Sequence, residues 1–372
     1  MKRRYLAIRL GACLVSLAAA AITPAAITPA WAQDPPAVMT AGATEKEALR
    51  ARIAAAKAEG VLSYWDAVIT PETNDELVAT FRRTYGMPAG FAVKYTQSAT
   101  LSLVTRVEQE TASGNVTIDV ASLASPPWLN SLVAGNHILR YESPEHAHYA
   151  RAIATGIGRA GYFVPLGAYC FVPGWNTETL TFKGTSWRDV LRAVPPGRIS
   201  TNDAPNSATG LLSYMALRQN LGVDFFRELA KMKPRFIVRS EQTAEALVTG
   251  QDLMAFGASP GRFFQSNEKG ATLKFLLPKE GIVLLGAGTF ILAKAPHPNA
   301  ARLWVDFVLS AAGQTILSKR EALISVRSGF KSPLPEYAPA IDDLTLMPVD
   351  WNAITAEDIR RAKEEWREIF AP

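Results

Sequence analysis

One serine of this chain stands in a pattern that nucleophilic enzymes use. Gly257-Ala-Ser-Pro-Gly261 has the spacing of a nucleophile elbow, in which the serine hydroxyl attacks a carbonyl carbon. That chemistry also needs the backbone N–H of the residue after the serine as an oxyanion donor, and Pro260 has no N–H. The only histidine downstream, His297, stands between two prolines. An exported serine hydrolase that uses Ser259 is therefore kept as an alternative hypothesis, and we expect no catalytic residues.

Two further motifs have structural explanations. Gly156-Ile-Gly-Arg-Ala-Gly161 matches the dinucleotide fingerprint, but that motif needs a strand before it and a helix after it. Here a helical pattern precedes the glycines and an extended aromatic run follows them. Glu142, Glu145, His146 and His148 lack a helical i, i+4 histidine pair, which favours a solvated loop over a metal cluster. We therefore expect no cofactor and no metal site.

Hydroxyl residues at predicted helix starts indicate a different chemistry, namely anion binding. The N-terminus of a helix presents unpaired N–H groups and a positive partial charge, so several of them around one cleft bind phosphate, sulfonate or carboxylate. These starts follow predicted strands, where open α/β sheets bind ligands. An arginine before one start adds a bidentate contact, a tryptophan offers an apolar wall, and an aspartate accepts from a ligand hydroxyl or amine. The candidate ligand-binding residues are Trp65, Asp66, Ser98, Thr100, Ser125, Ser207, Thr209, Arg239, Ser240 and Ser259.

The elements that must position these residues alternate between strand and helix. Capping patterns predict that Thr44-Glu-Lys-Glu47 and Thr73-Asn-Asp-Glu76 open helices ending near Gly60 and Gly86, and that Asp224 caps another. Alternation of this kind implies mostly parallel sheets with helices on both sides. Two apolar extended runs are predicted to cross between lobes, at 161–175 and 281–293. Strands are predicted at 61–65, 91–95, 118–121, 198–200, 235–238 and 253–256.

The N-terminus predicts secretion. A basic head, Met1-Lys-Arg-Arg4, precedes an apolar stretch and the small-x-small site Ala30-Trp-Ala32, so residues 1–32 read as a cleavable signal peptide. The whole chain has 39 Lys+Arg against 34 Asp+Glu, and the signal holds four of the basic residues and no acidic one. The mature chain is thus nearly neutral and has no basic run, which argues against nucleic acid as a partner.

Length and cysteine content describe the mature chain further. About 340 mature residues exceed what one hydrophobic core usually serves, so two lobes are expected. Cys13 leaves with the signal, and Cys170 lies alone in an apolar neighbourhood, which predicts a buried structural thiol.

The segment from Pro296 to Thr315 resembles a helix of bacterial extracytoplasmic solute-binding proteins, the ligand-capturing components of ABC importers. Pro298 suits the first turn of a helix, and Leu303, Phe307 and Val308 fall at helical spacing, with Gly313 predicted to interrupt the run. The branch it resembles most is annotated for ferric iron and small anions. Weaker matches in the same order along the chain are Ala56-Lys-Ala-Glu-Gly60, Ile118-Asp-Val120 and Ser186-Trp-Arg-Asp-Val-Leu191.

This resemblance implies an α/β protein with a two-lobed type II periplasmic-binding-protein-like fold, each lobe a mixed, mostly parallel sheet flanked by helices. It implies a first lobe at 44–168 and 283–322 and a second at 169–282 and 323–372. It also implies a periplasmic monomer that closes over a small-molecule solute and docks on the membrane subunits of an ABC importer.

The resemblance further places the iron ligands of the ferric branch. They are a histidine after the first strand, a glutamate after the third, and two adjacent tyrosines, which fall near Val68, Ala124, Ser259 and Pro260. None of these residues is a metal ligand, and the sequence has no Tyr-Tyr pair. Because ferric ion needs anionic oxygen donors, a small organic or phosphorylated anion is the expected solute. Ferric iron or a metal chelate remains the alternative.

Overall fold

Strands and helices alternate along the chain in the computed structural model, which describes residues 34–371. The predicted signal peptide lies outside the described residues. The strands are β1 (Val61–Asp66), β2 (Ala92–Gln97), β3 (Val120–Leu123), β4 (Phe163–Tyr169), β5 (Val172–Asn176), β6 (Ile199–Asn202), β7 (Arg235–Ile237), β8 (Met254–Ala258), β9 (Leu273–Phe275) and β10 (Leu285–Ile291). The α-helices are α1 (Pro36–Thr40), α2 (Lys46–Glu59), α3 (Pro71–Tyr85), α4 (Thr100–Ser113), α5 (Pro126–Ala134), α6 (Ala150–Ala154), α7 (Trp187–Val190), α8 (Ala208–Leu221), α9 (Val223–Lys231), α10 (Ser240–Val248), α11 (Pro260–Asn267), α12 (Pro298–Leu309), α13 (Ala311–Glu321) and α14 (Ala356–Phe370). Three short 3₁₀ turns are η1 (Pro144–Tyr149), η2 (Ala204–Asn206) and η3 (Ile341–Asp343).

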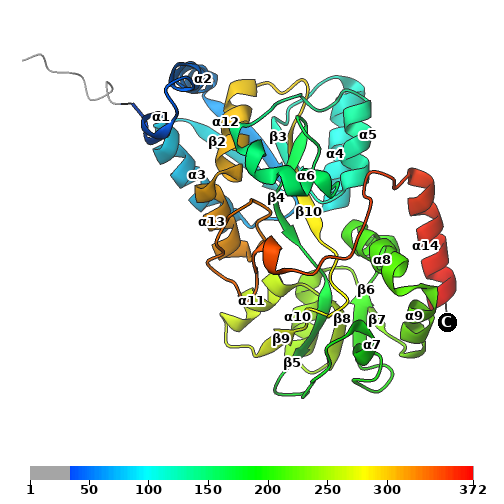
Figure 1. Cartoon of the computed structure of the whole chain (residues 1–372). Coiled ribbons are helices and arrows are strands. Elements are labelled where there is room, and N and C mark those ends of the chain that lie inside the picture. The colour runs from blue at the N-terminus through cyan, green and yellow to red at the C-terminus, as the bar shows by residue number, and fades with distance from the viewer. Residues whose placement is uncertain (1–33, 372) are drawn as a thin grey trace, which may run out of the picture. The chain divides into compact units, whose positions relative to one another are not determined.

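The strands form two sheets of the same plan (Figure 1). The first has the order β2-β1-β3-β10-β4 and the second the order β7-β6-β8-β5-β9. In each sheet three strands run parallel, and a strand that arrives from the other lobe joins them antiparallel: β10 in the first and β5 in the second. The predicted two-lobed α/β fold with mixed sheets is confirmed. Four of the five strands of each sheet run in the same direction, and the crossing strand pairs antiparallel on both sides, so half of the strand pairings are parallel.

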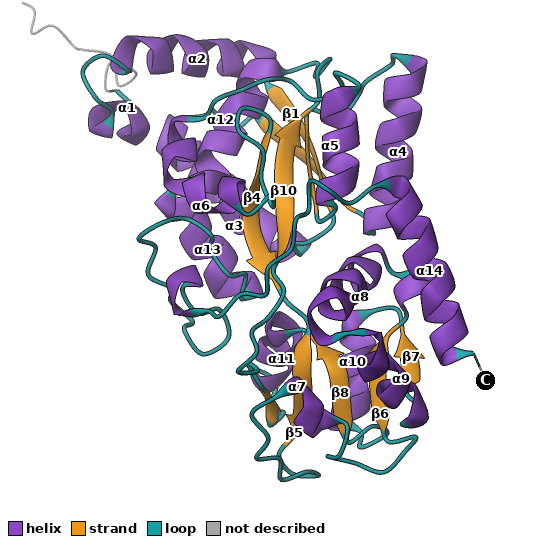
Figure 2. Cartoon of the chain, turned by 45° about the vertical axis from the view of Figure 1, so that its right-hand side comes forward, coloured by secondary structure: helices purple, strands orange, loops and turns teal. Residues whose placement is uncertain are grey.

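Both predicted crossings between the lobes are present. β4 belongs to the first sheet and β5 to the second, and only Cys170 and Phe171 separate them. The apolar run that ends in β10 carries the chain back. After α13 the chain crosses again. Ile324 bridges Ala168 of β4, and the chain ends in α14, which packs on α8 and α9 of the second lobe (Figure 2).

The ends of several helices differ from the predicted caps. Thr44 does not cap α2, whose N-cap is Glu45, and α3 is capped by Thr70, whose hydroxyl accepts from the Thr73 N–H. Gly222 and not Asp224 precedes α9. The predicted stops are correct: Gly60 and Gly86 adopt the left-handed conformation that ends α2 and α3. The capping errors shift the helix starts by a few residues and leave the strand exits in place.

The helix pair α12 and α13 is buried against the first sheet, as its spacing predicts. The ring centroid of Trp304 lies 5.3 Å from that of Phe81 and 5.2 Å from that of Tyr64, and all three side chains are fully buried. The break between the helices is at Ser310, which caps α13, and not at Gly313. Gly313 lies inside α13, where a Cβ would overlap the carbonyl oxygen of Phe307.

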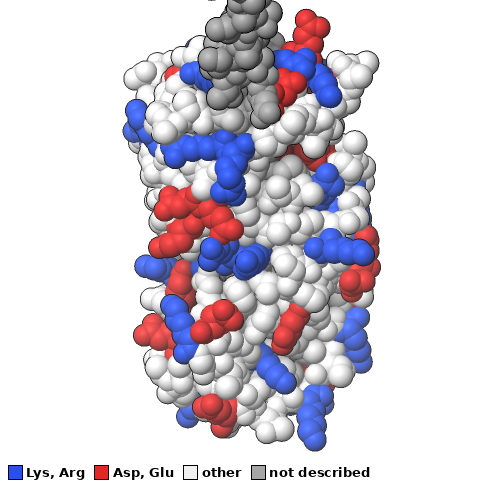
Figure 3. Space-filling model, turned by 90° about the vertical axis from the view of Figure 1, so that its left-hand side faces the viewer, with Lys and Arg blue, Asp and Glu red and all other residues white. Residues whose placement is uncertain are grey.

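Three further features of the described residues are the thiol of Cys170, the length and polarity of the helices, and the charge on the surface. Cys170 is 1% exposed, and burial raises the pKa of its thiol to about 12, so the prediction of a structural thiol is confirmed. Within residues 34–371, every helix is too short or too polar to span a bilayer. On the face seen in Figure 3, Lys and Arg side chains alternate with Asp and Glu side chains.

Candidate functional site

Residues of both lobes surround a hollow where the strands of the two sheets end. We call it the central hollow, and its volume is about 160 Å³. It is lined by Ala67, Val68, Thr100, Tyr169, Phe171, Thr209, Ser240, Ser259, Gly261, Arg262, Glu321, Ala322 and Leu323. Four of these residues are among the predicted ligand-binding residues: Thr100, Thr209, Ser240 and Ser259.

Each of these four lies in or beside the first turn of a helix that follows a parallel strand. Thr100 begins α4 after β2, Thr209 lies in α8 after β6, Ser240 begins α10 after β7, and Ser259 precedes α11 after β8. The carboxyl ends of parallel strands lie at one edge of a sheet. Within each lobe, the helix starts that follow these strands therefore lie at that edge. The hollow therefore combines one helix start from the first lobe with three from the second.

The amide groups of these helix starts are largely unused by side chains. No side chain caps α4, α10 or α11, since Ala99, Arg239 and Ser259 at their N-caps accept no hydrogen bond from their own helices. Only α8 is self-capped, by Ser207, whose hydroxyl accepts from the Gly210 N–H at 3.1 Å. First-turn N–H groups left without a side-chain acceptor are suited to binding an anion.

Arg262 in the first turn of α11 is the cation among the residues that line the central hollow. Its side chain is 24% exposed, and its Nη2 lies 3.1 Å from Oε1 of Glu241. Its Nη1 donates to Oε1 of Gln265 at 2.7 Å. These two contacts orient the guanidinium and leave some of its five N–H donors for a ligand.

The carboxylate of Glu321 also lines the hollow, but its charge is directed at a helix terminus. One oxygen accepts from the Thr70 N–H at 2.7 Å, from the Thr70 hydroxyl at 2.7 Å and from the Thr73 hydroxyl at 2.5 Å. These groups form the N-terminus of α3, whose positive partial charge offsets the carboxylate. The next residue, Ala322, has a φ of 50°, a conformation that costs a non-glycine residue about 1–2 kcal/mol. Backbone strain of this kind is often held at functional sites.

Tyr169 lines the central hollow at the point where the chain leaves the first lobe for the second. It is the last residue of β4 and is half-buried, and burial raises the pKa of its phenol while a hydrogen bond with Thr209 lowers it. The phenol is therefore neutral near pH 7 and acts as a hydrogen-bonding group.

Six predicted residues lie outside the central hollow. Asp66 is fully buried, and its oxygens accept from the Tyr64 hydroxyl at 2.7 Å and from the N–H groups of Val68 and Ile69. Its carboxylate therefore shapes the turn after β1 instead of facing a ligand. Burial raises the pKa of Asp66 to about 6.

Three others lie elsewhere in the fold. Trp65 packs in the core cluster that includes Leu103, with the Arg106 guanidinium 5.7 Å from its ring centroid. The side chain of Arg239 is 72% exposed and faces Glu241 at 3.9 Å. Ser98 is half-buried and its hydroxyl faces its neighbour's carbonyl group. None of the three lines a hollow described here.

The last two predicted residues, Ser125 and Ser207, lie in an adjoining space that we call the apolar hollow. Its volume is also about 160 Å³. It is lined by Thr100, Leu101, Val104, Ser125, Trp128, Ala204, Pro205, Ser207, Ala208, Leu211, Leu212, Ile359 and Lys363.

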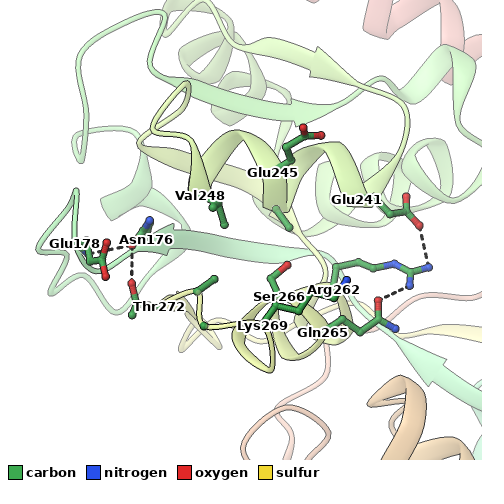
Figure 4. A pocket seen from close by; sticks show the side chains of 13 residues that line it. Asn176, Glu178, Glu241, Glu245, Val248, Arg262, Gln265, Ser266, Lys269 and Thr272 are labelled. Atoms are coloured by element: carbon green, nitrogen blue, oxygen red, sulfur yellow. Dashed lines mark hydrogen bonds and ion pairs between the residues drawn. The ribbon is translucent and has the colours of Figure 1, made fainter.

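A third space, the lateral hollow, belongs to the second lobe alone. Figure 4 shows it between α10 and α11, with a volume of about 490 Å³ and with Glu178, Glu241 and Glu245 around it. Arg262 lines both this space and the central hollow, and Figure 4 shows its contacts with Glu241 and Gln265. Because no residue of the first lobe lines the lateral hollow, closure of the lobes would not bury a solute there.

Sequence reasoning missed Tyr169, Arg262 and Glu321. Arg262 stands one residue beyond the Gly257–Gly261 motif, so the search for a nucleophile ended just before the cation. Tyr169 lies within the crossing predicted at 161–175, which is a usable signal. Glu321 comes from a distant helix, and no local pattern indicates its position.

The geometry offers the hydrolase and iron alternatives little support. Ser259 has an extended backbone, no histidine is found among the described residues lining its hollow, and His297 is hydrogen-bonded to Asp119 at 2.8 Å. Glu321 and Tyr169 are the only carboxylate and phenol in that lining. Within residues 34–371, no group of three or more His, Cys, Asp or Glu side chains is arranged to hold a metal ion.

Solved structures share this architecture. A substrate-binding protein of an ABC transporter from Agrobacterium tumefaciens is 17% identical, with a TM-score of 0.71 over 83% of this chain and 94% of that one. The periplasmic binding protein AfuA from Actinobacillus pleuropneumoniae, solved with exogenous fructose-6-phosphate, is 19% identical, with a TM-score of 0.69 over 83% and 98%. Iron-bound HitA from Pseudomonas aeruginosa is 18% identical, with a TM-score of 0.67 over 83% and 99%.

These structures establish the fold, and the sequence itself establishes the family. No curated protein matches the chain. The family model for bacterial extracellular solute-binding proteins matches residues 76–343, which include both sheets' crossing strands and all residues of the central hollow except Ala67 and Val68. The chain therefore belongs to the family of bacterial extracellular solute-binding proteins.

Proposed function

We propose that this protein captures a small organic or phosphorylated anion between its two lobes in the periplasm and delivers it to the membrane subunits of an ABC importer. One observation supports the anion above all: Arg262 and the starts of four helices from both lobes surround the central hollow. Amide groups and one guanidinium bind phosphate or carboxylate without a strongly basic surface. The nearly balanced charge of the mature chain agrees with such a site.

Capture would follow from closure of the lobes. An anion held by Ser240, Ser259 and Arg262 of the second lobe gains Thr100 and the start of α4 only when the first lobe approaches. A solute that contacts both walls binds the closed form more tightly and shifts the equilibrium toward it. The proposal needs no covalent step. We place the lobe boundaries near 168/169, 282/283 and 322/323, where the chain passes between the two sheets.

The relatives support the solute class to different degrees. AfuA was solved with a sugar phosphate and HitA with iron. A sugar phosphate presents the dianion that helix starts and an arginine bind, whereas the central hollow has few anionic oxygen donors for a ferric ion. Secretion to the periplasm and a monomeric state are parts of the same proposal.

A ligand panel tests the proposal. Thermal unfolding of the mature protein would be followed with phosphate monoesters, sulfonates, carboxylates, polyols, amines and ferric citrate. A bound anion at about 100 times its Kd stabilises the folded state by about 2.7 kcal/mol, and each kcal/mol shifts the Tm by about 2–4 °C or less for a chain of this size. Stabilisation by polyols or amines, with none by any anion, would contradict the proposal. Native mass spectrometry of freshly purified protein would identify a retained solute.

A further inference from the structure

The apolar hollow differs in chemistry from the central hollow beside it. Most of its lining is hydrocarbon, and the side chains come from both lobes: Leu101, Val104 and Trp128 from α4 and α5, and Leu211, Leu212 and Ile359 from α8 and α14. Figure 2 shows α14 alongside α8, at the side of the molecule where α4 and α5 lie. The lateral hollow, in contrast, carries three glutamates.

The two hollows adjoin each other. Thr100 lines both of them, and the start of α8 contributes its N-cap Ser207 to one and Thr209 to the other. A solute whose anionic group lies at Ser240, Ser259 and Arg262 would thus extend past Thr100 into the apolar hollow. Each space has a volume of only about 160 Å³, and together they reach the lower end of the roughly 300–1,000 Å³ typical of ligand sites.

Leu101 is an apolar residue of this lining that remains exposed to solvent. Its side chain is 53% exposed, although it stands in the first turn of α4 next to a cleft that the lobes share. A purely hydrophilic anion would leave Leu101 facing water or polar groups when the lobes close. An apolar group packed between the exposed Leu101 and the buried Leu212 would instead be removed from water together with the Leu101 side chain, which favours the closed form.

We propose that the solute carries an apolar body, aromatic or branched aliphatic, next to its anionic group, and that the apolar hollow binds that body. This inference rests on the proposed function, since it assigns the second half of the same solute. The anionic group is held in the central hollow, and Lys363 and the hydroxyls of Ser125 and Ser207 border the apolar body.

Isothermal titration calorimetry with two phosphate monoesters of similar size tests the inference. Phenyl phosphate and glycerol 3-phosphate share the anionic group and differ in the apolar body. We expect phenyl phosphate to bind at least about tenfold more tightly, because only its ring is removed from water in the apolar hollow. Leu101→Asn should weaken phenyl phosphate about fivefold or more and change glycerol 3-phosphate by less than about twofold.

Leu277→Asn is the matched control, since Leu277 is 40% exposed and lines none of the three hollows. It should change neither affinity. Equal or tighter binding of glycerol 3-phosphate, or an effect of Leu101→Asn no larger than that of Leu277→Asn, would overturn the apolar site and leave the anion site standing. Failure of both monoesters to bind would contradict this inference and exclude phosphate monoesters as the solute, whereas the anion site itself is excluded only if no anion of the panel stabilises the protein.

Discussion

At the residue scale, the site depends on which of two arginines faces the solute. Both Arg239 and Arg262 lie near the start of a second-lobe helix, and both contact Glu241. Arg239 is 72% exposed and lines none of the three hollows, whereas Arg262 is 24% exposed and lines the central one. The sequence predicted Arg239 as the arginine that binds the anion, and the proposed site has Arg262 in its place.

These two arginines give a matched pair of variants. Arg262→Gln should weaken binding of any anion that stabilises the protein by roughly 10- to 100-fold, the loss expected for one or two hydrogen bonds to a charged group. Arg239→Gln should change the affinity by less than about twofold. Calorimetric titration of both variants measures this, and equal losses would mean that the anion does not lie beside Arg262.

Asp66 predicts a pH dependence of stability. Burial raises the pKa of Asp66 to about 6, from a value near 3.8 in the unfolded chain. Between these values the folded protein binds a proton that the unfolded chain has released, so this group's stabilising contribution is complete below pH 4 and is lost as the pH rises through 6. The loss is on the order of 2–3 kcal/mol.

Urea unfolding of wild type and Asp66→Asn at pH 4.5 and pH 7 isolates this contribution. An asparagine cannot ionise, so the variant should be more destabilised relative to wild type at pH 4.5 than at pH 7. A difference between the two proteins that stays constant, or that grows with pH, would show that the carboxylate is ionised throughout. Asp306 has a similarly raised pKa but remains in both proteins and therefore cancels.

At the element scale, the close approach of two helix ends shapes the central hollow. The start of α11 in the second lobe meets the end of α13 in the first, where the Gln265 side chain donates to Glu321 at 3.3 Å. Gly261 permits this approach, because a Cβ on it would lie 2.6 Å from the backbone carbonyl oxygen of Glu321. Backbone atoms cannot move aside as a flexible side chain can.

Gly261→Ala should therefore destabilise the protein by about 1–3 kcal/mol, as overpacking does. Helix propensity alone predicts the opposite sign, a gain of up to about 1 kcal/mol for alanine in α11. Chemical denaturation decides between them. Gly90→Ala is the control, since no atom lies near a Cβ at that position and the stability should change by less than about 0.5 kcal/mol. A stabilised Gly261→Ala variant would mean that α11 and α13 separate at little cost.

At the scale of the whole molecule, three stretches of chain connect the two sheets. Cys170 and Phe171 lead into the second lobe, the run before β10 leads back, and the segment after Ala322 crosses a third time before α14. α14 is held to the second lobe by Trp366, whose ring centroid lies 5.0 Å from that of Tyr214, and by the Arg218–Glu365 ion pair. The Asn130 side chain of α5 in turn donates to that of Asn352, just before α14.

Closure about these connections has a measurable consequence. Small-angle X-ray scattering should record a smaller radius of gyration when phenyl phosphate, or whichever anion binds most tightly in the panel, is added at saturation. The Arg262→Gln variant should need about 10- to 100-fold more anion to reach the same smaller radius. An unchanged radius in the wild type, with binding proven by calorimetry, would argue against closure as the means of capture.

The sequence by itself determined the order of the elements and the chemistry of their ends. Hydrophobic spacing and glycine stops located the strands and helices, since these signals are local: Gly60 ends α2 and Gly86 ends α3 as expected. The hydroxyls Thr100, Thr209, Ser240 and Ser259 were found because each follows a strand, and the edge of a parallel sheet is a property of chain order. The resemblance in the α12 and α13 segment named the family.

Only the tertiary structure decided which of these side chains share a space. Whether a residue at a helix start points into the cleft depends on a rotation of about 100° per residue, so Arg239 and Arg262 could not be separated by spacing. Asp66 is not part of the proposed site, because the N–H groups of its own turn donate to its carboxylate. The apolar hollow joins α4 and α5 with α8 and with α14, which begins more than 200 residues after α5 ends, and such a junction exists only once the chain has crossed between the lobes and returned.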